Sequence, residues 1–67
     1  MPTVKVLELV GVSDKSWDDA VRNALKEAAK TVRGISGVDV LRKTGKIKDG
    51  KIVEYHADCK FAFRVES

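Results

Sequence analysis

The sequence predicts an α+β fold in the order β-α-β-β, in which one amphipathic helix packs on the apolar face of the strands. Three observations support this: a β-branched run at residues 3–10, an apolar stripe of helical spacing that begins at Trp17, and two long strand-like runs joined by Asp49-Gly50. The chain has 67 residues, which suffices for one domain spanning residues 1–67.

The first strand is expected at residues 3–10, which read TVKVLELV. This run is dense in valine and leucine, as strands are. Residues 11–15 (GVSDK) are expected to connect it to the helix.

The helix is expected to run from Trp17 to about Arg33. Ser16 can cap its start by accepting a hydrogen bond from the backbone N–H of Asp19, and acidic residues in the first turn suit the helix dipole. Gly34 fits the left-handed position that ends a helix. The apolar stripe consists of Trp17, Ala20, Val21, Ala24, Leu25, Ala28 and Val32.

A hairpin follows, with strands expected at residues 38–48 and 51–65. If Asp49 and Gly50 are the two loop residues, the numbers of paired positions sum to 99. The expected pairs are Ile47 with Ile52, Val40 with Cys59, Val38 with Phe61 and Asp39 with Lys60. This register also places Lys43 across from His56.

The last strand alternates between two faces. One is apolar, and the other carries Glu54, His56, Asp58, Lys60 and Arg64. A strand of about 14 residues spans roughly 46 Å, whereas a helix of about 17 residues spans roughly 25 Å. One helix therefore leaves part of the apolar face uncovered.

Self-association is the expected way of covering that face. A domain of this size buries only about 60% of its unfolded surface, so small domains rely on disulfides, metals or oligomerisation. Cys59 is the single cysteine, so no disulfide forms within the chain. We therefore expect a symmetric homo-oligomer.

The charge pattern argues against several function classes. The formal net charge of +3 arises from interspersed cations and anions, which is typical of a solvated surface. No apolar run is long enough to span a membrane and no signal-peptide pattern is visible, so the expected location is cytoplasmic. A nucleic-acid module is the alternative that Lys43, Lys46, Lys48 and Lys51 suggest, but no aromatic residue separates these lysines.

Few residues suggest chemistry. His56 is the one side chain of a type that titrates near neutral pH, and no serine or cysteine is placed to form a triad with it, so no catalytic residue is assigned. Cys59 is expected in the core. Glu8, Asp14, Asp18 and Asp19 are the candidates for gathering a cation, although they lack calcium-loop spacing and no metal site is assigned.

The order of features resembles the dodecin family over nearly the whole chain. The resemblance rests on Val6-x-Glu8-Leu9-Val10-Gly11-Val12-Ser13, on the alanine-rich helix closing with Thr31-Val32-Arg33, and on Glu54-Tyr55-His56 leading to residues 61–66 (FAFRVE). It implies a three-stranded antiparallel sheet partly wrapped around the helix. It also implies a hollow homododecamer that stores a flavin such as FMN, FAD, riboflavin or lumichrome between its subunits, without enzymatic activity.

The resemblance also implies the candidate site residues. Gly37 lies where flavin-binding dodecins carry a stacking tryptophan, and His56 lies where they carry a glutamine that hydrogen-bonds the ring edge. Both fall on one sheet face in the expected register. Because glycine has no ring, we expect FMN or riboflavin to bind more weakly here than to tryptophan-bearing dodecins. Trp17 is expected to cover the helix start or a seam between subunits; a contribution to a neighbour's ligand pocket is the alternative.

Overall fold

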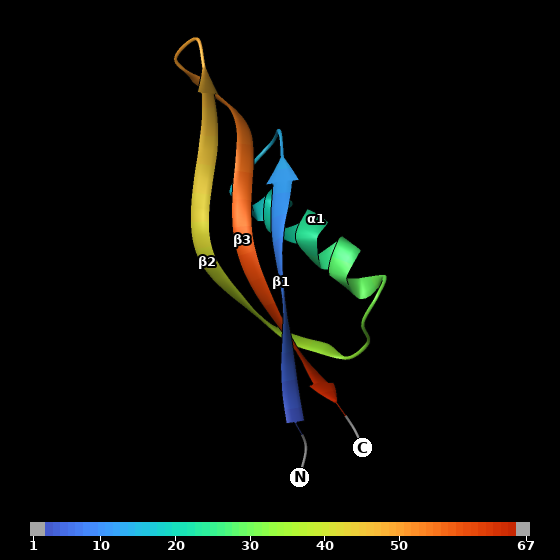
Figure 1. Cartoon of the computed structure of the whole chain (residues 1–67). Helices are drawn as coiled ribbons and strands as arrows, with labels where there is room; N and C mark the ends of the chain where they lie inside the picture. Colours follow the sequence, from blue (N-terminus) through green and yellow to red (C-terminus); the bar gives the residue numbers. More distant parts are fainter. Residues whose placement is uncertain (1–2, 66–67) are drawn as a thin grey trace.

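A computed structural model describes residues 3–65 of the chain. Its elements are β1 (Thr3–Ser13), α1 (Trp17–Ala29), β2 (Ile35–Lys48) and β3 (Lys51–Val65) (Figure 1). The strands form one antiparallel sheet in the order β1-β3-β2, so β3 is central. The predicted α+β class and β-α-β-β order are confirmed.

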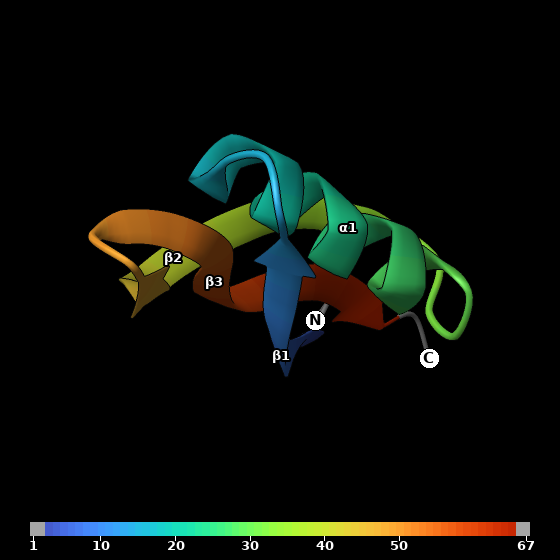
Figure 2. The same ribbon diagram turned by 90° about the horizontal axis from the view of Figure 1, so that it is seen from above.

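Helix α1 lies across one face of the sheet (Figure 2). It buries a row of small residues, Ala20, Ala24 and Ala28, against a buried group on β3, namely Ala57, Cys59 and Phe61. Because alanine projects only a methyl group, the helix approaches the sheet closely. Leu25 flanks this row and stays 42% exposed, so the apolar stripe of the helix is only partly covered.

Strand β1 continues to Ser13, three residues beyond its predicted end. Gly11 therefore lies within the strand and not in a connection. A Cβ atom at Gly11 would come within 1.9 Å of the backbone oxygen of Ala20. The glycine is required by the close contact between strand and helix, which the sequence pattern alone did not show.

Helix α1 ends at Ala29, so its predicted continuation to Arg33 is wrong. The chain tightens after Ala28, whose carbonyl oxygen accepts from the backbone N–H groups of Thr31 and Val32 and from the Thr31 hydroxyl. Val32 consequently lies outside the helix. Gly34 does adopt the left-handed conformation, with φ 74°, but in the loop that leads to β2.

The predicted hairpin register holds at both ends and fails in the middle. Ile47 pairs with Ile52 and Val40 with Cys59, as expected, and so do Val38 with Phe61 and Asp39 with Lys60. Between Arg42 and Lys46, however, the pairing shifts by one residue, with irregularities at Val40/Arg42 and Lys46/Ile47. His56 therefore lies opposite Thr44 and not Lys43. The two register shifts cancel one another, so a pairing register counted outward from the turn residues in the sequence does not reveal them.

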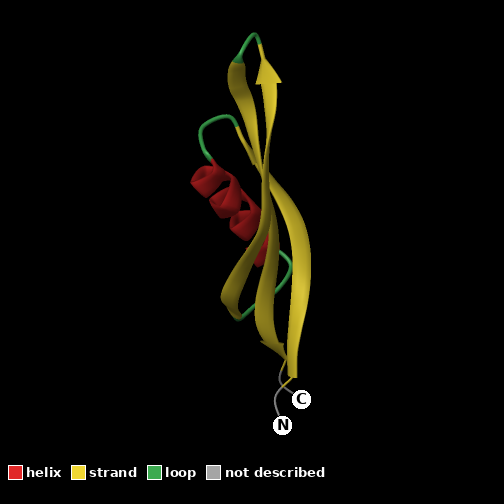
Figure 3. Cartoon of the chain, turned by 90° about the vertical axis from the view of Figure 1, so that its left-hand side faces the viewer, coloured by secondary structure: helices red, strands yellow, loops and turns green. Residues whose placement is uncertain are grey.

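The hairpin extends well past the helix and past the end of β1 (Figure 3). Ile47 and Ile52 face one another in this overhang and are 69% and 42% exposed. The chain measures 52 × 19 × 13 Å along its principal axes, an elongated shape for so few residues. Over residues 3–65, the single helix is too short and too polar to cross a bilayer.

Candidate functional site

The sheet face turned away from α1, here called the open face, carries the candidate residues. Side chains alternate across β1 and β3, so Leu9, Cys59 and Phe61 face the helix while their neighbours face outward. The open face comprises Val4, Val6, Glu8, Val10 and Val12 on β1, the even-numbered residues from Glu54 to Arg64 on β3, and Gly37, Asp39, Arg42, Thr44 and Lys46 on β2.

His56 lies near the hairpin end of the open face, between Val12 on β1 and Thr44 on β2. Its Nε2 donates to Glu54 Oε1 at 2.6 Å, and both side chains are partly exposed. This bond fixes the ring and occupies Nε2. Nδ1 is therefore the atom through which His56 would reach a ligand.

Gly37 lies near the other end of the sheet, on edge strand β2 opposite Ala62. A Cβ atom placed there would meet only the Cβ of Ala62, at 3.8 Å, which is an ordinary contact. The backbone of Gly37 also borders a groove of about 250 Å³ between α1 and β2. The walls of this groove are nearly all apolar: Val21, Leu25, Ile35, Val38 and Phe61.

Within one chain the two predicted site residues are far apart. Ala62, the partner of Gly37, lies six positions beyond His56 on β3. At about 3.3 Å per residue, the two backbones are roughly 20 Å apart. A single copy of the chain therefore does not bring Gly37 and His56 into one pocket.

Trp17 fastens the start of α1 to the hairpin. Its indole Nε1 donates to the backbone oxygen of Thr44 at 2.8 Å, and its ring meets Tyr55 edge-to-face with centroids 4.8 Å apart. These contacts lie on the helix side of the sheet, so Trp17 does not contribute to the open face of its own chain.

Family comparisons agree with this architecture. A sequence model described as Dodecin matches residues 3–66. This chain belongs to the dodecin family. A dodecin from Thermus thermophilus is 34% identical over 62 residues, covering 92% of this chain and 90% of the relative.

Solved structures give the same picture. The dodecin of Streptomyces coelicolor has a TM-score of 0.92 and 36% identity, covering 98% of this chain and 94% of that one. A Thermus thermophilus protein has a TM-score of 0.95 and 31% identity, covering 100% and 98% respectively. The dodecin fold is thus preserved where about two thirds of the residues differ.

A carboxyl pair on the open face of this dodecin-family chain escaped the sequence analysis. Glu8 and Asp58 come from neighbouring strands; their hydrogen bond, followed by the Asp58 charge, raises the pKa of Glu8. Lys60 and Arg42 oppose that shift. Asp58 Oδ1 is enclosed and has no hydrogen-bond partner among residues 3–65. The alternation of side chains along both strands was the available signal, because it points Glu8 and Asp58 outward. Recognising the two as neighbours also requires the β1–β3 register.

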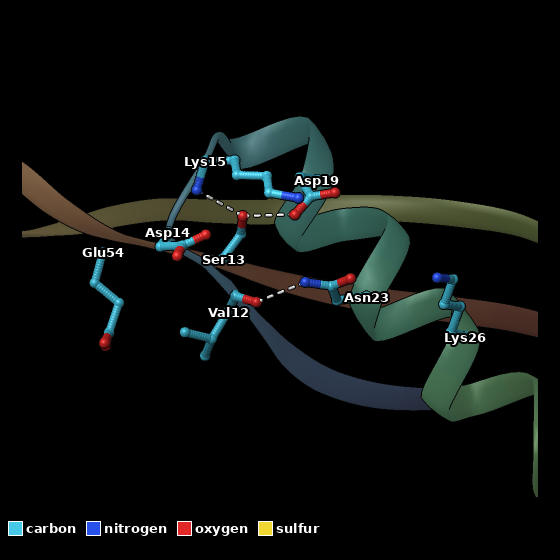
Figure 4. Close-up of a pocket in the computed structure, with 8 residues that line it drawn as sticks. All are labelled: Val12, Ser13, Asp14, Lys15, Asp19, Asn23, Lys26 and Glu54. Carbon is cyan, nitrogen blue, oxygen red and sulfur yellow. Dashed lines mark hydrogen bonds between the residues drawn. The ribbon is translucent and has the colours of Figure 1, made fainter.

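The acidic residues considered for a cation do not gather. Asp14 and Asp19 border a polar pocket of about 480 Å³ at the start of α1, whereas Asp18 borders a different pocket and Glu8 lies on the open face (Figure 4). Asp19 accepts from the Ser13 hydroxyl at 2.7 Å, and this bond lowers its pKa. Asn23 donates to the Val12 carbonyl oxygen at 2.9 Å. Across residues 3–65, no three metal-ligating side chains lie together.

Proposed function

We propose that this dodecin-family chain acts as a non-enzymatic homo-oligomer, a homododecamer as the family resemblance implies, with small-ligand pockets between its subunits. The observation that carries this proposal is the separation of Gly37 and His56. Both residues belong to the open face, yet they lie roughly 20 Å apart in one chain. Residues of a shared pocket must then come from two copies.

The exposed apolar surface supports self-association. Val4, Val6, Val10 and Val12 form a stripe on the open face and are 44–60% exposed. Patches of this kind on a small protein mark interaction sites. Native mass spectrometry of the protein as purified tests this part of the proposal: a stable 7.4 kDa monomer would contradict it, and a retained ligand would appear as added mass.

The ligand class proposed is a flat aromatic molecule such as riboflavin or FMN. Nδ1 of His56 can accept a hydrogen bond from a ring N–H group, because Nε2 donates to Glu54. Gly37 provides open space where a stacking ring would stand. Stacking on an aromatic side chain is worth about 1–3 kcal/mol in nucleic-acid sites, so its loss should weaken flavin binding by one to two orders of magnitude.

Gly37→Trp tests the flavin proposal directly. We expect the variant to bind riboflavin roughly ten-fold to a hundred-fold more tightly than the wild type, as measured by quenching of flavin fluorescence. Gly37→Leu is the matched control, because it adds bulk without a π-surface. Equal affinities in all three proteins would contradict a flavin pocket at this position.

An oligomer with no flavin function is the second candidate, and the absence of a ring at Gly37 favours it. Retention of the full assembly together with no riboflavin binding, in the wild type and in Gly37→Trp, would select this alternative. The nucleic-acid alternative has less support, because Lys43 faces the helix side of β2 while Lys46 faces the open face.

A further inference from the structure

Charged side chains gather at the centre of the open face. Glu8 on β1 and Asp39 on β2 both lie opposite Lys60 of β3, so this row reads acid, base, acid across the sheet. In the next row Asp58 of β3 lies opposite Arg42 of β2. Neighbouring strands are about 5 Å apart, so these charges act on one another. We call this set the charge cluster: Glu8, Asp39, Arg42, Asp58 and Lys60.

The acids of the charge cluster outnumber its bases by one. Glu8 and Asp58 are diagonal neighbours on adjacent strands, and a hydrogen bond between two carboxyl groups requires one of them to carry a proton. That bond and the Asp58 charge raise the pKa of Glu8, whereas Lys60 and Arg42 act in the opposite direction. A proton on Glu8 therefore neutralises the cluster and turns a repulsion into a hydrogen bond.

Asp58 lacks partners that would satisfy its charge in another way. Its Oδ1 atom is enclosed and accepts no hydrogen bond within residues 3–65. In the same part of the chain, no ion pair involves a member of the charge cluster. An enclosed carboxylate is stabilised by a nearby donor, and protonated Glu8 is such a donor on the adjacent strand.

Covering the open face should strengthen proton binding. Glu8 is exposed in a single chain, where water screens its repulsion from Asp58. When a second copy covers the face, as the proposed function requires, this water is lost and an excess negative charge becomes costly. Loss of solvent favours the neutral form of a carboxyl group, so the covered pair holds its proton more tightly than the exposed pair does.

We infer that Glu8 and Asp58 share a proton in the assembled protein, so that each chain takes up a proton on assembly and the oligomer weakens as pH rises. The inference rests on the proposed function and adds a regulation to it. The proton is bound more tightly in the oligomer than in the separated chain. Assembly is therefore strongest below the pKa of Glu8 in the separated chain and declines until pH exceeds its higher pKa in the oligomer.

The pH dependence of dissociation tests this inference. We expect the concentration at half-dissociation, measured by light scattering from about pH 5 to about pH 8 in enough urea to reach it, to rise by up to about ten-fold per pH unit. Glu8→Gln keeps the size and a donor toward Asp58 but has no titrating proton. Its assembly should lose this dependence and match the wild type at acidic pH. His56 also lies on the open face, but it is present in both proteins, so the difference between them isolates Glu8.

Two controls separate the carboxyl pair from charge in general. Asp39→Asn removes another acid of the charge cluster but leaves the Glu8–Asp58 pair, so it should keep most of the pH dependence. Glu27→Gln makes the same chemical change on an exposed position of α1 and should behave like the wild type. A profile that Glu8→Gln leaves unchanged, or that Asp39→Asn flattens just as fully, would overturn the inference while leaving the proposed oligomer standing. A wild type that is monomeric at every pH would instead overturn the proposed function.

Proton counting provides a second measurement. Dilution calorimetry in two buffers of different ionisation enthalpy should show that dissociation of the wild type releases about one proton per chain within this pH range, and that Glu8→Gln releases correspondingly fewer. Equal proton release by the two proteins would contradict a shared proton at Glu8 and Asp58.

Discussion

Gly11 shows how one residue sets the distance between two elements. A Cβ atom at this position would lie 1.9 Å from the backbone oxygen of Ala20, so no side chain fits between strand and helix. Gly11→Ala should therefore lower the free energy of unfolding by about 1–3 kcal/mol, the usual cost of overpacking. Thermal unfolding followed by circular dichroism measures this.

Gly37→Ala is the matched control for Gly11→Ala. Its new methyl group would only touch the Cβ of Ala62, at 3.8 Å. Since the backbone at Gly37 does not have a positive φ, the change should be neutral or slightly stabilising. Similar losses of stability in both variants would show that the Gly11 contact is not the cause.

Glu8 gives a prediction for the pH dependence of stability. Its hydrogen bond to Asp58 and the charge of that residue raise its pKa, so the folded state holds this proton more tightly than the unfolded state does. Stability from this source is present at acidic pH and is lost as pH rises through the raised pKa. Glu8→Gln should remove that loss and shift the urea midpoint upward at neutral pH.

Asp19 provides the control of opposite sign. The Ser13 hydrogen bond lowers the pKa of Asp19, so its contribution is present at neutral pH and is lost as pH falls through that lowered pKa. Asp19→Asn should therefore lower the urea midpoint at neutral pH and reduce the loss of stability in acid. Parallel pH profiles for wild type and Glu8→Gln would refute the role given to the Glu8–Asp58 pair.

At the scale of elements, helix α1 depends on its ends because it is short. Ser16 Oγ accepts from the backbone N–H of Asp19 at 3.0 Å and caps the first turn. Ser16→Ala should cost about 1 kcal/mol, whereas Ser16→Asp should cost little because aspartate also caps. Urea denaturation compares the two, and equal losses would mean that the cap does not stabilise the helix.

The hairpin is the element that the rest of the chain covers least. Its tip exposes Ile47 and Ile52, and its edge borders the apolar groove at Gly37. The predicted mismatch between a long strand and a short helix is therefore present, and the helix is shorter still than expected. The mismatch leaves apolar surface for other copies to cover.

At the scale of the whole molecule, the small core predicts that thermal stability depends on protein concentration. Over residues 3–65 the core is small even for a domain of this size. Its buried apolar residues are Ala20, Ala24 and Ala28 on α1 and Ala57, Cys59 and Phe61 on β3. If association supplies the missing burial, the melting temperature should rise with protein concentration. Scanning calorimetry over a hundred-fold concentration range measures this, and an unchanged melting temperature together with a monomeric mass would contradict it.

Local chemistry in the sequence determined the element types, their order and the hairpin pairing at both ends of the predicted strands. Alternation, the Ser16 cap and the Asp49-Gly50 turn each act within a few residues, so their effects can be read without a structure. The resemblance to dodecins added Gly37 and His56 as site candidates. Tertiary structure alone decided the end of α1, the contact at Gly11, the Glu8–Asp58 pair and the distance between Gly37 and His56. These features depend on how strands and helix meet, because bulges shift the pairing and close approach selects glycine at positions where no local pattern points to it.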